Sequence, residues 1–189
     1  MPPLRSWIGW TLAAALLELG CAGHESRVRS ALEALDRGDS DQAIAELNAE
    51  MEVPSAEVLP PMEGDNALLL LDRATILQST RRHQLSQRDF GAADQAIEVL
   101  DLSRDAADDI GKYLFSDDAG PYRAPPFEKL LVNSFNMMNY LARRDVSGAK
   151  VEARRLAIMQ RYLEDKQEET SLLGLGSYLA GFAFEKAGS

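Results

Sequence analysis

The stretch FEKLLVNSFNMMNYLARRDVSGAKVEARRLAIMQRYLED, residues 127–165, decides the fold, because it reads as two amphipathic helices joined by a turn. Apolar side chains recur at helical spacing in both halves, which predicts helices over Phe127–Arg143 and Gly148–Asp165. The first stripe contains Phe127, Leu130, Leu131, Phe135, Met138 and Leu141, and the second contains Ala149, Ala153, Leu156, Met159 and Leu163. The stretch is therefore expected to form an antiparallel helical hairpin.

The turn of this hairpin, Arg144–Ala149, has two counterparts earlier in the chain, at Gly38–Ile44 and Arg88–Ala93. In all three, a small or basic residue precedes an Asp, and an Ala follows after three further residues. The Asp can cap free backbone amides where the next helix starts, and the Ala lets that helix approach its partner closely. The template predicts three hairpins of the same kind.

The rest of the chain predicts further helices and two loops. No segment has the alternating pattern rich in Val, Ile and Thr that a strand requires, so the predicted fold is all-α. Proline and glycine break the helical pattern over Glu52–Asp65 and Ser116–Pro126, which predicts loops there. The remaining predicted helices are Glu25–Leu35, Asp41–Met51, Asn66–Gln87, Ala92–Phe115 and Ser171–Lys186.

The first turn, with its Ala43-Ile44 pair, resembles the mid-repeat turn of a tetratricopeptide repeat (TPR). Further partial matches are Ala31, Tyr140, Gly181, Phe184 and Gly188. The turns and the final glycine lie 50, 56 and 44 residues apart, whereas a TPR repeats every 34 residues or so. The resemblance implies a degenerate TPR-like solenoid of stacked antiparallel hairpins over residues 21–189. Helical hairpins with a generic Asp-capped turn are the alternative.

The N-terminal residues 1–20 have the layout of a signal peptide. Arg5 precedes an apolar run from Trp7 to Leu17, which is too short to cross a bilayer as a helix. The end of this segment, from Leu16 to Cys21, resembles the lipobox of bacterial lipoproteins, with Glu18 where that family prefers an aliphatic residue.

This resemblance implies that Cys21 is lipidated and becomes the mature N-terminus. Ala22 after the cysteine favours the outer membrane, so the expected location is the bacterial cell envelope, with the body facing the periplasm. Residues 120–156 also resemble a poorly characterised group of TPR-like lipoproteins. A plain secreted protein with an incidental thiol, or an uncleaved membrane anchor, remains the alternative.

Composition narrows the classes of function. The formal net charge of −10 argues against nucleic acid as a partner. One cysteine and two histidines supply neither an internal disulfide nor a multi-His metal site. No phosphate-binding loop, dinucleotide-binding glycine motif, nucleophile elbow or zinc-protease motif occurs in the sequence. We therefore expect no catalytic residues, no metal and no cofactor.

Two features suggest recognition of another protein. Asn133, Asn136 and Asn139 recur every three residues, and amides that donate and accept suit the backbone of an extended peptide. Tyr122 and Arg123, in the second loop, are of types enriched at interface hot spots. Burial of the amides between helices, and packing of the loop over helix ends, would explain the same residues.

The last predicted helix is apolar almost all round, because residues 172–184 carry no charge. Such a helix should be buried on more than one side. It is expected to be covered by another subunit, or by a downstream part of a longer protein if the chain is truncated at its C-terminus. The alternative is that it forms the final core element of a complete bundle.

Together these features predict a membrane-tethered lipoprotein that serves as a non-catalytic, TPR-like scaffold for other envelope proteins. The competing reading is an envelope enzyme, or an enzyme-accessory domain, with an acidic cleft. Convergent carboxylates beside His83 in a pocket would favour the enzyme.

Overall fold

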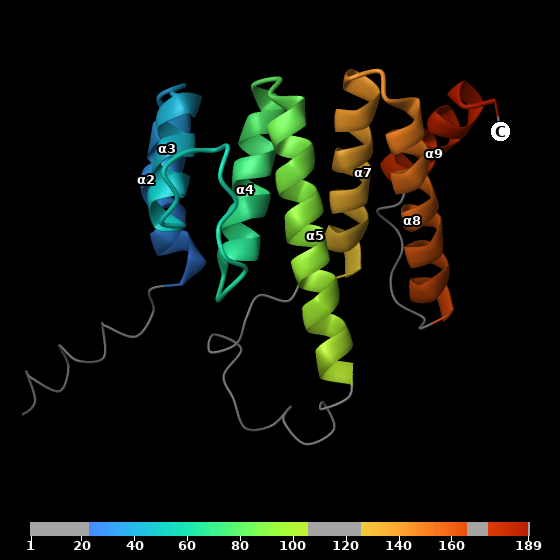
Figure 1. Ribbon diagram of the computed structural model, residues 1–189, viewed down its shortest axis with the longest axis horizontal. Helices are drawn as coiled ribbons and strands as arrows, with labels where there is room; N and C mark the ends of the chain where they lie inside the picture. The colour runs from blue at the N-terminus through green and yellow to red at the C-terminus, as the bar shows by residue number, and fades with distance from the viewer. Residues whose placement is uncertain (1–22, 106–125, 166–173, 189) are drawn as a thin grey trace, which may run out of the picture.

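The computed structural model describes residues 23–105, 126–165 and 174–188, and within these ranges it is all-helical, as predicted (Figure 1). The helices are α2 (His24–Asp36), α3 (Ser40–Glu50), α4 (Asn66–Ser79), α5 (His83–Asp105), α7 (Pro126–Ala142), α8 (Val146–Asp165) and α9 (Gly174–Lys186). The signal segment 1–20, Cys21, Tyr122 and Arg123 lie outside the described residues. Among the helices described, none is long and apolar enough to cross a membrane.

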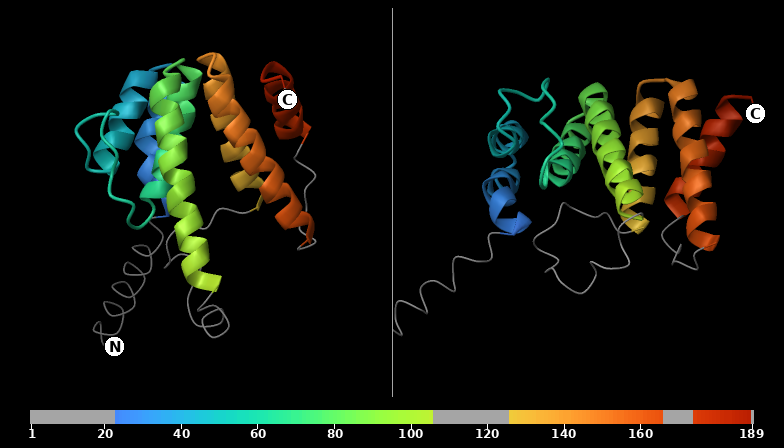
Figure 2. Two further views of the ribbon diagram at one scale, coloured as in Figure 1. Left: turned by 45° about the vertical axis from the view of Figure 1, so that its right-hand side comes forward. Right: turned by 60° about the horizontal axis from the view of Figure 1, so that its bottom comes forward.

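The helices form a row of antiparallel hairpins, α2–α3, α4–α5 and α7–α8, which ends in α9 (Figures 1 and 2). Helix α3 packs against α4, and α5 packs against α7, so each hairpin contacts the next one along the chain. Helix α9 lies against both α7 and α8, in the place where a fourth hairpin would begin. The predicted stack of helical hairpins is confirmed.

The three hairpins turn in the same way. The first helix of each ends before a residue with a left-handed backbone, with φ of 78° at Gly38, 63° at Arg81 and 60° at Arg144. The amide of the residue after it then donates to a carbonyl five residues back, over 2.9, 2.8 and 2.8 Å respectively. This is the helix-ending arrangement that glycine favours, yet arginine adopts it in two of the three hairpins. The repeat is therefore one of backbone geometry more than of sequence.

The predicted Asp caps are found in the first and third turns. The Asp39 carboxylate accepts from the amide of Gln42 over 2.9 Å, and Asp145 accepts from the amide of Gly148 over 2.9 Å. Each cap satisfies an amide that the first turn of its helix leaves free.

The prediction of a turn at Arg88–Ala93 is wrong. These residues lie inside α5, and the turn of the second hairpin comes earlier, at residues 80–82. The predicted helices Asn66–Gln87 and Ala92–Phe115 are accordingly misdivided. The physical reason is that Asp89 is fully buried and bonded to Arg73 of α4, so it joins two helices instead of capping one.

Two apolar clusters form the core. One joins α2, α3, α4 and α5 and reaches Val132 of α7, and the other joins α7, α8 and α9. Small residues stand where helices come closest, since the fully buried set includes Ala34, Ala43, Ala74, Ala93, Ala149, Ala153 and Ala183. The two clusters meet at α7, which contributes Val132 and Phe135 to the first and Leu130 and Met137 to the second, and α7 also carries a row of polar side chains.

Candidate functional site

The three asparagines of α7 lie inside the protein. Their exposed fractions are 3% for Asn133, 3% for Asn136 and 0% for Asn139. This burial agrees with the alternative of amides held between helices, and the expectation that the row binds an extended peptide stays a prediction. A role in binding a partner segment would require the helices to separate, because buried amides cannot reach an outside chain.

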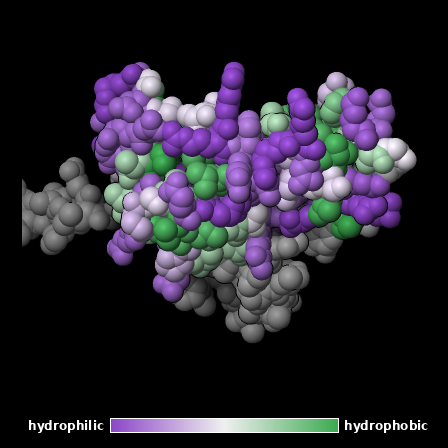
Figure 3. Space-filling model, turned by 45° about the horizontal axis from the view of Figure 1, so that its top comes forward, coloured by the Kyte–Doolittle hydropathy of each residue, from purple (hydrophilic) through white to green (hydrophobic). Residues whose placement is uncertain are grey.

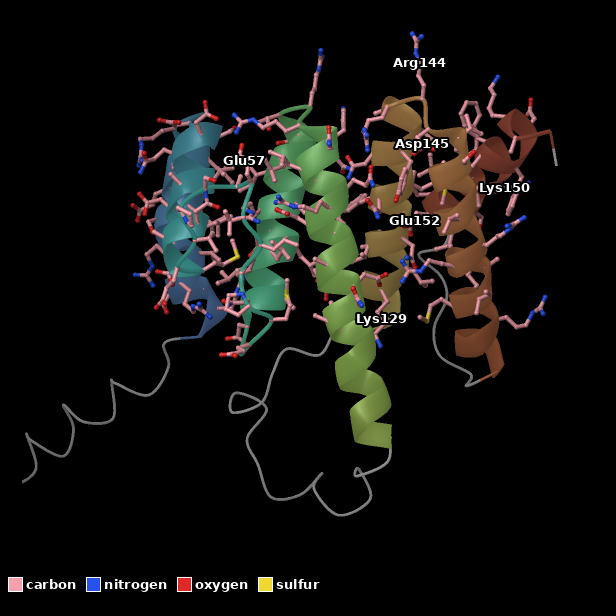
Figure 4. The ribbon with its side chains drawn as sticks, viewed as in Figure 1. Glu57, Lys129, Arg144, Asp145, Lys150 and Glu152 are labelled. Carbon is pink, nitrogen blue, oxygen red and sulfur yellow. The ribbon has the colours of Figure 1, made fainter. Side chains whose placement is uncertain are left out.

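Asn133 and Asn136 hold the carboxylate of Glu152, which lies between α7 and α8 in Figure 4. The Nδ2 of Asn133 donates to one oxygen of Glu152 over 3.2 Å, and that of Asn136 donates to the other over 3.1 Å. Glu152 is only 4% exposed. Burial raises the pKa of Glu152, and the nearby Arg155 guanidinium and the Asn133 amide oppose the shift. The Oδ1 of Asn136 is buried without a hydrogen bond.

Arg155 extends this cluster to a third helix. Its guanidinium lies 3.8 Å from Glu152 and forms an ion pair with Asp94 of α5. One polar cluster thus connects α5, α7 and α8. Both carboxylate oxygens of Glu152 accept amide hydrogens, so the contacts of this group serve to join helices.

Asn139 connects α7 to the second hairpin. Its Nδ2 donates to the hydroxyl of Ser86 over 2.8 Å, while its Oδ1 accepts from the amide of Gln78 over 3.0 Å. The Nδ1 of His83 lies 3.1 Å from the same oxygen. His83 is therefore engaged at a helix junction and faces an asparagine, not the convergent carboxylates that the enzyme reading would need.

Sequence reasoning missed the buried Arg73. Its Nε donates to Asp89 over 2.7 Å, and its other nitrogens donate to Asn48 and to the backbone carbonyl of Val58, over 2.7 and 3.1 Å. Both members of the Arg73–Asp89 pair are fully buried. A lone arginine inside the apolar run of residues 67–77 was the available signal. The pair anchors α4 to α5, to α3 and to the following loop.

A second group of titratable side chains consists of His24 of α2, Asp72 of α4 and Glu128 of α7, which interact electrostatically. His24 contacts Asp72 through Nε2 over 2.8 Å. Burial raises the pKa of Asp72, although His24 opposes the shift, and burial together with the charge of Asp72 raises the pKa of Glu128. Among the described residues, no group of three His, Cys, Asp or Glu side chains has an arrangement able to hold a metal ion.

The outer side of the last two helices is apolar and exposed. We call this surface the terminal face and define it by five residues, Val151 and Ile158 of α8 and Leu175, Tyr178 and Phe182 of α9. Tyr178 and Ile158 are 72% and 71% exposed. Figure 3 shows hydrophobic surface, interleaved with hydrophilic side chains, at the end of the molecule that α8 and α9 form. Helix α9 is covered where it meets α7 and α8, whereas its outer side is exposed, so burial on more than one side is not found among the described residues. Coverage by another subunit or by a downstream part stays a prediction.

Comparisons with known proteins found no match. No family model, no curated protein and no solved structure is significantly similar to this chain.

Proposed function

We propose that this chain is a membrane-tethered lipoprotein of the bacterial cell envelope and acts as a non-catalytic, TPR-like scaffold that binds other envelope proteins. The observation that carries the proposal is the terminal face. Monomeric proteins rarely expose several large apolar side chains together, and such patches mark protein-interaction sites. An exposed tyrosine, Tyr178, belongs to the patch, and tyrosine is a residue type enriched at interface hot spots.

The interior polar groups support the same assignment. Glu152, Asn139 and Arg73 all have their polar groups engaged in contacts between helices. These groups hold the stack together, so the side chains that remain available to bind a partner are those on the surface. A stack of hairpins suits this role, because it presents an extended surface built from several helices.

The tether is supported by the resemblance to a lipobox that ends at Cys21. Only two residues separate Cys21 from His24, where α2 begins. Several acyl chains would hold the body at a membrane surface essentially permanently, at about 0.8 kcal/mol per buried methylene.

The anchor is tested by Cys21→Ser and by labelling cells with an alkyne-bearing fatty acid. We expect the variant to lose the label and to leave the membrane fraction. Ser26→Ala serves as the matched control and should keep both. Unchanged labelling and fractionation of Cys21→Ser would show that the chain is not a lipoprotein.

The scaffold role is tested with a photo-crosslinking amino acid placed in the full chain in native membranes. At Tyr178 we expect a protein cross-link of defined size, whereas Thr75, exposed on α4, serves as the control and should give none. If neither Tyr178 nor Ile158 cross-links to any protein, the terminal face does not bind a partner and the proposal fails.

A further inference from the structure

The terminal face is bordered by positive charge, although the whole chain carries −10. Residues 146–161 of α8 contain four basic side chains and one acidic side chain, and that single carboxylate belongs to the buried Glu152. Arg154 and Arg161 are exposed on α8, and two acidic residues follow only at its end, at positions 164 and 165. Arg155 is already paired with Asp94, and on α9 the exposed Glu185 and Lys186 offset each other. Arg154 and Arg161 therefore give the apolar surface a cationic border on α8, which favours an occupant with acidic and apolar side chains.

The opposite end of the molecule has that chemistry. Hairpin α2–α3 lies at the far end of the row from α9 (Figure 1). Residues 24–50 carry seven acidic and three arginine side chains, a formal net charge of −4. Glu33 and Asp36 are exposed on α2 beside Leu32, which is 49% exposed. Arg29 of α2 and Arg37, which follows it, are also exposed, so the first hairpin presents an excess of acidic over basic groups around an apolar side chain.

The backbone of α9 also allows close approach from outside. A glycine inside a helix is unfavourable relative to alanine, so it often has a packing reason. At Gly176 the reason lies within the chain, because a Cβ there would come within 2.6 Å of Ser134 and 2.8 Å of Leu156. At Gly181, on the exposed side, a Cβ would meet nothing within 4 Å. Gly181 leaves room for a second helix beside Tyr178 and Phe182.

We propose that the terminal face of one copy binds the α2–α3 hairpin of a second copy, head to tail. This inference rests on the proposed function and names the partner of the same surface. Charge decides the direction, because a back-to-back pair of terminal faces would bring Arg154 and Arg161 of both copies together. A head-to-tail contact instead sets the −4 hairpin against the cationic α8, and complementary charge selects such arrangements.

The head-to-tail contact continues the order already present within the chain. Each hairpin packs against the next in one direction, and a second copy would follow α8–α9 as α4–α5 follows α2–α3. A contact between two different surfaces of identical chains does not form a closed two-fold dimer. It generates a ring or an open row of copies instead. The result is a scaffold whose length grows with its local concentration on the membrane.

The test joins two copies of the full chain in native membranes with a short bismaleimide. One copy carries Arg29→Cys on exposed α2 and the other carries Ala157→Cys on exposed α8, each with a different epitope tag. Cys21 is the chain's one natural cysteine, so the parent protein measures the background. We expect a cross-link between the two different variants and none when either variant is expressed alone. Cross-linking of Ala157→Cys copies to each other, or no cross-link between the mixed variants, would overturn the proposal.

Charge reversal tests the stated chemistry. Arg154→Glu with Arg161→Glu should lower the yield of the mixed cross-link roughly tenfold, because opposed like charges weaken an interface strongly. Glu33→Arg with Asp36→Arg in the other copy should restore it. A yield that neither change alters would overturn the proposal.

Gly181→Leu tests close approach to α9. It should lower the cross-link yield while leaving the circular dichroism spectrum unchanged, since the space around Gly181 is open. Gly91→Leu, on α5 with equally open surroundings, is the control and should leave the yield unchanged. An unaffected yield in Gly181→Leu would count against the contact.

The photo-cross-linking amino acid at Tyr178 separates this inference from the proposed function, because it reacts with any neighbouring chain and needs no cysteine in the partner. If it captures only a protein of different mass, the second copy is not the occupant, yet the terminal face still serves a scaffold. If it captures no protein at all, at Tyr178 or at Ile158, the inference and the proposed function both fail.

Discussion

Replacing Glu152 with alanine should destabilise the protein markedly, although a buried carboxylate is itself costly. The side chain accepts hydrogen bonds from the amides of Asn133 and Asn136, and both amides are buried. Leaving a buried donor without an acceptor costs about 1–3 kcal/mol. Glu152→Ala leaves two buried donors without an acceptor, which destabilises the fold, but it also removes the cost of burying a charge. On balance we expect it to lower the free energy of unfolding by roughly 2–4 kcal/mol at pH 7.

Glu152→Gln separates the hydrogen bonds from the charge. Glutamine keeps one acceptor oxygen and adds an N–H donor. The unpartnered Oδ1 of Asn136 can accept a hydrogen bond from this N–H once the Asn136 amide has rotated. We expect this variant to be within about 1 kcal/mol of the parent at pH 7, or more stable. Urea denaturation of parent and variants, with the m-value checked for two-state behaviour, measures both changes. A loss in Glu152→Ala below about 0.5 kcal/mol, the usual range of a surface change, would refute the role assigned to Glu152.

The pH dependence of the same pair has a definite sign. The pKa of Glu152 is raised in the folded state, so the cost of its charge is fully present above that pKa. As the pH falls through it, the folded state takes up a proton that the unfolded state does not, and the parent gains stability relative to Glu152→Gln. Asp72 and Glu128 have raised pKa values in both proteins, so the difference between the two denaturation curves isolates Glu152. A difference that stays constant from pH 7 down to the ordinary pKa of 4.5 would contradict the raised pKa.

Three further predictions concern packing. Arg73→Ala should cost about 2–4 kcal/mol in urea denaturation, because it leaves one oxygen of the buried Asp89 and the Oδ1 of Asn48 without their donor while Arg88 still pairs with the other Asp89 oxygen. Arg73→Met with Asp89→Leu should cost less, and an equal loss in both would argue against the ion pair as the cause. Asn139→Ala should lower stability by roughly 1–3 kcal/mol, since it removes one of the two partners of the Ser86 hydroxyl and the acceptor of Gln78, and an unchanged melting temperature would show that the junction does not depend on it. Gly176→Ala should lower the free energy of unfolding by about 1–3 kcal/mol, because its Cβ would overpack against Ser134 and Leu156. Gly181→Ala should raise the melting temperature, because alanine favours the helix and the space around Gly181 is open. Similar shifts of the melting temperature in both variants would contradict this difference in surroundings.

Helical period predicted most of the fold, because amphipathic stripes report directly which side of a helix is buried. The hairpin of residues 127–165 is found with its ends displaced by no more than two residues. The sequence misled only at the second hairpin, where Arg88-Asp89 resembles the residues before the other Asp caps. An Asp before a helix and an Asp buried beside an arginine on another helix have the same local sequence. The distinction depends on a contact with Arg73, sixteen residues away.

The candidate site was harder to predict than the fold. The three-residue spacing of the asparagines correctly indicated a shared face of α7, but periodicity does not reveal whether a polar face meets solvent or another helix. The deciding partners, Glu152 and Ser86, lie in different helices. The uncovered side of α9 agrees with the expectation that another subunit or a downstream part would have to cover this helix, and whether either does so stays a prediction. Only the arrangement of α7 and α8 shows which side of α9 is uncovered.

The polar contacts of α7 also have a mechanical consequence. Helix α7 belongs to the first apolar cluster through Val132 and Phe135 and to the second through Leu130 and Met137. Its asparagines add hydrogen bonds to both neighbours, such as those of Asn139 to Ser86 and of Asn133 to Glu152. Hydrogen bonds fix the relative position of two helices, because they weaken steeply when their geometry changes. Under a sideways load, α7 should therefore resist sliding past either neighbour more strongly than apolar packing alone would allow.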